Sequence, residues 1–107
     1  MGKSGGAVAK TVQVLLEHGA DVTARNDGHS TPLHLASSKG FLGNTQLMIK
    51  HGADVNARDD TYSTPLHLAS SIRDPSLVQL LIEHDADVNS LDEKRRTPLH
   101  LALAWVS

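Results

Sequence analysis

Apolar residues lie in short groups along the chain, and each group is followed by a polar stretch. The group at 33–36 comes directly after Thr31, a good N-cap residue, and Pro32, which suits the first helical position because its missing N–H costs nothing there. The pattern therefore predicts a short helix that begins after Thr31 and ends near Gly40.

A second apolar group, at 47–49, predicts a second helix that ends at Gly52, because glycine readily takes the left-handed conformation just after a helix. The polar residues at 53–63 predict an extended arm and a turn. In the following unit Asp74 is expected to cap the second helix, and Asp85 takes the place of the glycine, since Asp tolerates the left-handed region better than most residues.

The whole pattern recurs with a period of 33 residues. Thr-Pro-Leu-His occurs at 31–34, 64–67 and 97–100, and Glu-His-Gly-Ala-Asp-Val at 17–22 recurs with small changes at 50–55 and 83–88. Segments 31–63 and 64–96 are identical at 17 of 33 positions without a gap. A fixed period of this length predicts a solenoid, in which each unit buries its apolar face only against its neighbours.

Thr-Pro-Leu-His-Leu-Ala together with Gly-Ala-Asp-Val-Asn resembles the ankyrin repeat. The resemblance covers about residues 7–107 and implies an all-α repeat solenoid of stacked helix-turn-helix units with projecting hairpin-like fingers. It implies one domain over 1–107, which consists of five consecutive segments. These are a flexible leader (1–6), a half repeat with second helix and finger (7–30), two repeats (31–63 and 64–96) and a half repeat with a first helix (97–107).

The sequence departs from the family pattern at the fingers. His29, Tyr62 and Arg95 stand where the family usually has glycine, so we expect either another turn geometry or backbone strain at these positions. The side chains at these three positions either contact a partner or are the result of sequence variation that the fold tolerates. In the middle second helix, Gly43, Asn44 and Thr45 stand where the family prefers apolar residues. Because Gly and Asn are poor helix formers, we expect this to be the loosest part of the stack.

The two ends of the stack are half repeats without clear polar caps. The opening second helix is expected at about Val8–His18, and the closing first helix at Thr97–Val106. One alternative is head-to-tail self-assembly, in which these two helices pair between molecules and form a ring or a filament. The other is a monomer with frayed ends, or a piece of a longer protein. The apolar residues concerned are Val12, Val14, Leu15, Leu101, Trp105 and Val106.

The seven histidines raise the question of metal binding or catalysis, but six of them follow the repeat. His34, His67 and His100 belong to the Thr-Pro-Leu-His motif, where the family resemblance implies that they brace the turn near the Thr cap. The row at 18, 51 and 84 lies near helix C-termini, where partial positive charge is favourable. Equivalent residues of stacked helices lie ~8–10 Å apart, too far to share a zinc ion. We therefore expect no catalytic site, no metal and no cofactor.

Composition narrows the remaining function classes. A formal charge of −2 and a single short basic cluster at 94–96 argue against a nucleic-acid partner. The absence of an apolar run long enough to span a membrane, of a signal peptide and of cysteine predicts a cytoplasmic or nuclear protein. The leading hypothesis is a non-enzymatic interaction module or scaffold, natural or engineered, that binds another protein.

The resemblance implies that this partner contacts the finger tips and the exposed face of the first helices. The finger-tip candidates are Asp27, Ser30, Asp60, Thr61, Tyr62, Ser63, Glu93, Lys94 and Arg96. The first-helix candidates are Ser38, Lys39, Ser71, Ile72 and Trp105, and His51 and His84 add the end of the second helix. Tyr62 either anchors a partner or packs within its finger, and Trp105 either contacts a partner or covers the end of the stack. The tips run from acidic at 59–60 to basic at 94–96, which predicts directional docking.

Overall fold

The structure is a computed structural model that describes residues 3–104, with side chains described from residue 6 onward; Trp105 and Val106 lie outside this range. All regular structure in the described part of the chain is helical, which confirms the predicted all-α solenoid. The helices are α1 (Lys3–Glu17), α2 (Pro32–Lys39), α3 (Leu42–Lys50), α4 (Pro65–Ser71), α5 (Pro75–Glu83) and α6 (Pro98–Leu103).

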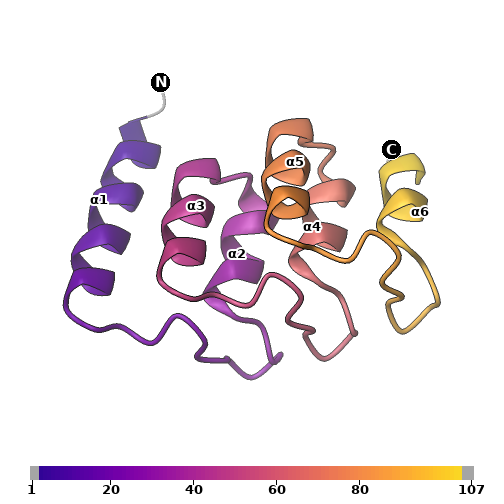
Figure 1. Ribbon diagram of the computed structural model, residues 1–107, viewed down its shortest axis with the longest axis horizontal. Coiled ribbons are helices and arrows are strands. Elements are labelled where there is room, and N and C mark those ends of the chain that lie inside the picture. The colour runs from indigo at the N-terminus through magenta and orange to yellow at the C-terminus, as the bar shows by residue number, and fades with distance from the viewer. Residues whose placement is uncertain (1–2, 105–107) are drawn as a thin grey trace.

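The helices form two rows that pack against each other (Figure 1). The first helices α2, α4 and α6 are neighbours in one row, and the second helices α1, α3 and α5 are neighbours in the other. Each connection from a second helix to the next first helix runs out as a finger on the same side of the stack (Figure 1). This arrangement brings residues 33 apart in sequence to equivalent places in neighbouring units.

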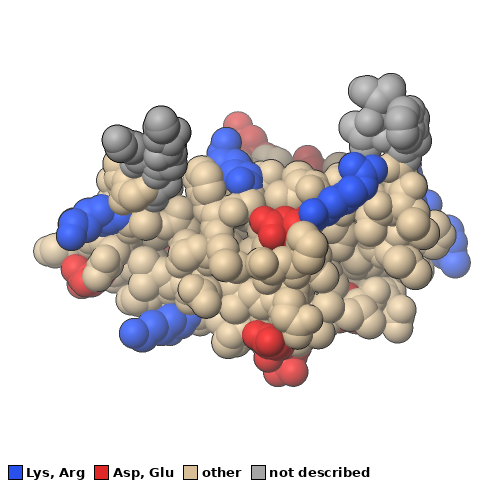
Figure 2. Space-filling model, turned by 90° about the horizontal axis from the view of Figure 1, so that it is seen from above, with Lys and Arg blue, Asp and Glu red and all other residues tan. Residues whose placement is uncertain are grey.

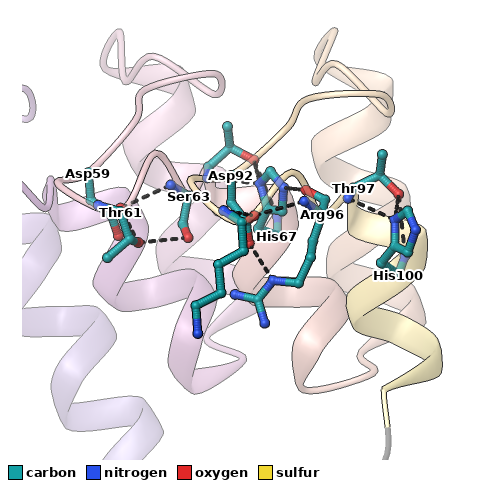
Figure 3. Close-up of polar contacts among 10 residues, drawn as sticks. Asp59, Thr61, Ser63, His67, Asp92, Arg96, Thr97 and His100 are labelled. Carbon is teal, nitrogen blue, oxygen red and sulfur yellow. Dashed lines mark hydrogen bonds and ion pairs between the residues drawn. The ribbon is translucent and has the colours of Figure 1, made fainter.

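A Thr–His pair starts each first helix, as the sequence predicts. The hydroxyl of Thr64 accepts the His67 amide (3.3 Å), while the amide of Thr64 donates to Nδ1 of the same histidine (3.1 Å). His67 Nε2 lies 2.8 Å from the Arg96 carbonyl oxygen, which can only accept, so Nε2 carries the proton and Nδ1 is the acceptor. Thr31 makes the same capping pair with His34, and Thr97 makes it with His100, the latter drawn in Figure 3. The predicted role of this histidine row in bracing the cap is confirmed.

The other predicted helix ends also agree with the structure. Gly40, Gly52 and Asp85 have φ values of 71°, 95° and 72°, and the Asp74 side chain accepts the Leu77 amide as an N-cap. Each of these residues pairs backbone groups at a helix end or lets the chain turn there. Because this depends on residue type and position alone, the sequence is sufficient to identify it.

The two terminal helices differ from the expected ranges. α1 begins at Lys3, so residues 3–6, which were expected to belong to a flexible leader, are helical. Once a helix has nucleated, each added residue gains a hydrogen bond at little further cost, and this offsets the poor helix propensity of glycine. α6 ends at Leu103, where Ala104 turns to an extended conformation (φ −64°, ψ 139°).

The core consists of aliphatic side chains between the two rows. Leu33, Leu66, Leu77 and Leu81 are fully buried. The middle second helix, α3, instead buries Asn44, whose Oδ1 has no hydrogen-bond partner among the described residues. An unpaired buried polar atom costs stability, so this is a local weak point in the packing.

Candidate partner-binding surface

The three fingers share one loop geometry, set by an Asn or Asp at equivalent positions. The side-chain oxygens of Asn26, Asp59 and Asp92 each accept the amides two and four residues further on, at 2.9–3.1 Å. The backbone closes the same loop, because each of these residues also donates its amide to the carbonyl four residues later. The loop shape is therefore held from inside, and the residues at its tip remain available to solvent.

Each finger requires one residue in the left-handed region. His29, Tyr62 and Arg95 have φ values of 60°, 62° and 61°, so the fingers keep the turn that glycine would favour and carry the strain of a side chain there. This conformation costs a non-glycine residue roughly 1–2 kcal/mol. The amide of each strained residue donates to the carbonyl three residues earlier (2.9 Å), which helps the loop to hold it in place.

The third finger contains an ion pair whose aspartate is buried. Asp92 Oδ2 accepts Arg96 Nε at 2.8 Å, and the aspartate side chain is almost completely buried whereas the arginine is about half exposed (Figure 3). Burial alone would raise the pKa of the Asp92 carboxyl. The hydrogen bonds from the Arg96 amide, its guanidinium and the Lys94 amide, together with the Arg96 charge, outweigh burial and lower that pKa below its ordinary value.

A basic and aromatic cluster lies between the first and second fingers. The guanidinium of Arg25 donates to the carbonyls of His29 (2.7 Å) and Arg58 (2.6 Å), and so ties the two fingers together. The guanidinium carbon of Arg58 lies 5.9 Å from the centre of the exposed Tyr62 ring, within the range of a cation–π contact. These side chains and Asp60 line a shallow hollow of about 400 Å³.

The two arginines of this cluster were not identified as candidates from the sequence. Arg25 and Arg58 are 33 residues apart, so the period itself could have revealed that they occupy equivalent places on adjacent fingers. Leu35, which is half exposed on α2, was also not identified as a candidate contact residue from the sequence. Its neighbours Ser38 and Lys39 are exposed, as are Ser71 and Ile72 at the same level of the next unit.

The predicted contact residues fall into an exposed set and two exceptions. Exposed are Asp27, Ser38, Lys39, His51, Asp60, Thr61, Tyr62, Ser71, Ile72, His84, Glu93, Lys94 and Arg96, and Ser30 is half-buried. Ser63 is instead buried: its amide donates to Asp59 Oδ1, and its carbonyl accepts the N–H of the His34 ring inside the stack. It is not an available tip residue. Trp105 lies outside the described residues.

Two of the charged side chains at the tips make contacts within their own finger. Asp59 Oδ1 is occupied by three hydrogen bonds within its own loop, and Arg96 is paired with Asp92. Asp60 is the more exposed carboxylate of the second finger, and it lies beside the basic Arg58. Figure 2 shows the side of the molecule opposite the fingers, where charged side chains are scattered.

The second histidine row occupies helix C-termini as expected. Nδ1 of His18 and of His51 lies 2.9 and 3.0 Å from the carbonyl four residues earlier, at Val14 and Leu47. No group of three or more His, Cys, Asp or Glu residues in the described part of the chain is arranged to hold a metal ion. In the same part of the chain, no helix has the length and apolar character needed to cross a membrane.

Two family models match the sequence. One, described as ankyrin repeats (many copies), matches residues 15–69, and the other, described as ankyrin repeats (3 copies), matches residues 43–106. No curated protein matched the chain in a sequence comparison. The second match covers all of α4, α5 and α6, together with most of α3.

Proposed function

The chain belongs to the ankyrin repeat family, and we propose that it is a non-enzymatic scaffold that binds another protein through its finger tips and first-helix face. Ankyrin repeats are generally protein–protein interaction modules. The site offers a binding surface rather than a reaction centre, because its polar side chains either close the finger loops or point to solvent.

The observation that carries this proposal is the cluster of Arg25, Arg58 and Tyr62 between two fingers. Tyrosine and arginine are the residue types in which interface energy concentrates. Here the tyrosine is exposed on a loop held by internal hydrogen bonds, so little conformational entropy is lost when a partner covers it. The exposed side chains of α2 and α4, including Leu35 and Ile72, extend the surface along the stack.

The test uses a Tyr62→Gly variant, because glycine accepts the left-handed conformation and removes the side chain without disturbing the finger. A partner is captured from a cell lysate on the immobilised chain, identified, purified and measured by titration calorimetry against each variant. We expect Tyr62→Gly to weaken binding by about tenfold or more, the effect of losing a central anchor. Arg96→Ala, at the tip of the third finger, should weaken it less.

Gln79→Ala is the matched control, since Gln79 is exposed on α5, away from the fingers. It should bind as the unaltered chain does. If Tyr62→Gly and Arg96→Ala both bind a purified partner with unchanged affinity, the finger surface is not the binding site and the proposal is wrong. Head-to-tail self-association, the alternative function, would join the two ends of the stack and leave Tyr62 on the middle finger uncovered.

A further inference from the structure

An apolar groove lies at the end of the stack between α5 and α6. Its volume is about 590 Å³, and no second helix lies beside α6 in the described part of the chain (Figure 1). Arg73 reaches across it, with its guanidinium donating to the carbonyls of Ala102 and Ala104. The apolar side chains of the groove come from both rows of helices and include Leu66, Val78, Ile82, Val88, Leu99 and Ala102.

The same groove exists one unit earlier in the stack, and there it is filled by α5. Leu33 and Leu66 are 0% and 1% exposed, but Leu99 at the equivalent position of α6 is 68% exposed. Val55 is 8% exposed, whereas Val88, 33 residues later, is 47% exposed. The end groove therefore has the shape and chemistry of a site that receives a second helix.

The opposite end of the stack presents a helix of that kind. α1 occupies the second-helix row, and the face that a first helix covers in complete units is open. Leu15 is 55% exposed, while its equivalents Met48 and Leu81 are 7% and 0% exposed. Val14 is 47% exposed against 7% for Leu80. Within the described residues, α6 therefore has no second helix beside it and α1 has no first helix beside it.

We propose that the occupant of the groove is a second copy of this chain, whose α1 packs beside α6 and completes a repeat. This contact continues the interface that α5 makes with α3 and α4 inside each chain. The proposal does not rest on the partner-binding function above, because it is argued from the end groove and α1 and not from the cluster of Arg25, Arg58 and Tyr62.

A histidine bond between units favours this occupant. His34 Nε2 and His67 Nε2 each pair with the carbonyl 29 residues further on, at 2.9 and 2.8 Å. His100 makes the same cap with its own threonine, but among the described residues its Nε2 has no partner. In a head-to-tail pair the equivalent acceptor is the carbonyl of Ser30 in the second copy.

An asparagine bond between units has the same open end. The Asn56 side chain donates to the Asp85 carbonyl (3.0 Å) and accepts the Asp87 amide (2.8 Å). Asn89 is the equivalent residue and is exposed at the edge of the groove. The backbone of residues 19–21 in the second copy supplies the matching carbonyl and amide.

The fingers provide complementary charge at the same junction. Within the chain the Glu93 amide donates to the Thr61 carbonyl of the preceding finger (2.9 Å). In a head-to-tail pair, the residue equivalent to Glu93 in the following finger is Asp27 of the second copy, and the residue equivalent to Thr61 is Lys94. The contact therefore places an acidic residue beside a basic one. Because the two joined surfaces differ, the contact is heterologous, and it closes into a ring or continues as a filament.

The test measures mass by sedimentation equilibrium from micromolar to millimolar chain. We expect the mass to rise with concentration above the 11.5 kDa of one chain. Leu15→Glu blocks α1 and Leu99→Glu blocks the groove, so each variant alone should remain monomeric. Mixed in equal amounts, they should form a dimer and nothing larger, because each retains the end that the other lacks.

A second pair of variants separates the junction from the fold. Asn89→Ala should weaken association by about threefold to tenfold without lowering the denaturation midpoint, as loss of hydrogen bonds at the junction requires. Asn56→Ala should lower the midpoint and leave association intact. The proposal is overturned if the unaltered chain stays monomeric at every concentration, if either glutamate variant alone still assembles, or if Asn89→Ala and Asn56→Ala weaken association equally.

Discussion

Replacement of the capping histidines one at a time separates the energy of the cap from that of the bond between repeats. His67 and His100 make the same pair with the threonine at the start of their helices. Only His67 also bonds the carbonyl of Arg96 in the following finger, and only His67 is fully buried. His67→Ala therefore removes three contributions, whereas His100→Ala removes one.

The expected magnitudes follow from these contacts. Loss of the reciprocal cap costs about 1 kcal/mol in either variant. At His67 the lost bond to the Arg96 carbonyl adds about 1 kcal/mol, and the space left by a buried imidazole adds about 1–2 kcal/mol. We expect His67→Ala to lower the free energy of unfolding by about 3–4 kcal/mol and His100→Ala by about 1 kcal/mol. The larger loss is a substantial share of the stability of a small domain, about 5–15 kcal/mol.

Urea denaturation followed by circular dichroism at 222 nm measures both values. The protein concentration is kept low enough for the chain to be monomeric, so that a contact between molecules does not protect His100. The difference of about 2–3 kcal/mol between the two variants is the quantity of interest. If the variants lose stability equally, the histidine acts only through its own helix cap, and the bond between repeats contributes nothing measurable.

Three further predictions concern single positions. Asn44→Leu should raise the free energy of unfolding by about 1–2 kcal/mol in urea denaturation, because it removes an unpaired buried carbonyl and because the equivalent residue of the next unit, Leu77, is fully buried. A loss of stability would contradict this. Asp92→Asn should keep the finger loop, as Asn26 does in the first finger, but reduce the acid dependence of stability. The folded-state pKa of Asp92 is lowered, so its contribution is present above the unfolded pKa and is lost as the pH falls through the folded value. Thermal unfolding between pH 6 and 2 should therefore be less pH-dependent in the variant, and parallel curves would refute the role of the ion pair. His29→Gly should stabilise the chain by about 0.5–1 kcal/mol, since relief of left-handed strain exceeds the added freedom of the unfolded chain, and a lower melting temperature would show that the turn is unstrained.

Features that depend on nearby residues could be predicted from the sequence. Each helix cap acts on backbone groups only a few residues away, as at Thr31, Gly40 and Asp74. Residue type and position are therefore sufficient to predict where these helices begin and end. The 33-residue period then gives the order of the helices, because a repeated unit must stack on its neighbours.

Features that depend on contacts between units could not be predicted in the same way. The burial of Ser63 follows from the closed finger loop and from the His34 ring of the preceding unit. The link from Arg25 to the Arg58 backbone exists only because adjacent fingers lie side by side. The choice at His29 between a new turn and a strained one was likewise decided by hydrogen bonds along the loop, not by its residue type.

The internally closed finger loop has a consequence for how readily the protein changes its binding preference. Shape depends on the Asn or Asp at the base of each finger and on backbone bonds, whereas the side chains of Asp27, Asp60 and Glu93 make no hydrogen bonds that close the loop. Substitutions at these positions should alter recognition with little effect on folding, which makes them suitable sites for a combinatorial library. Selection for a new target could then proceed on a backbone whose geometry stays constant.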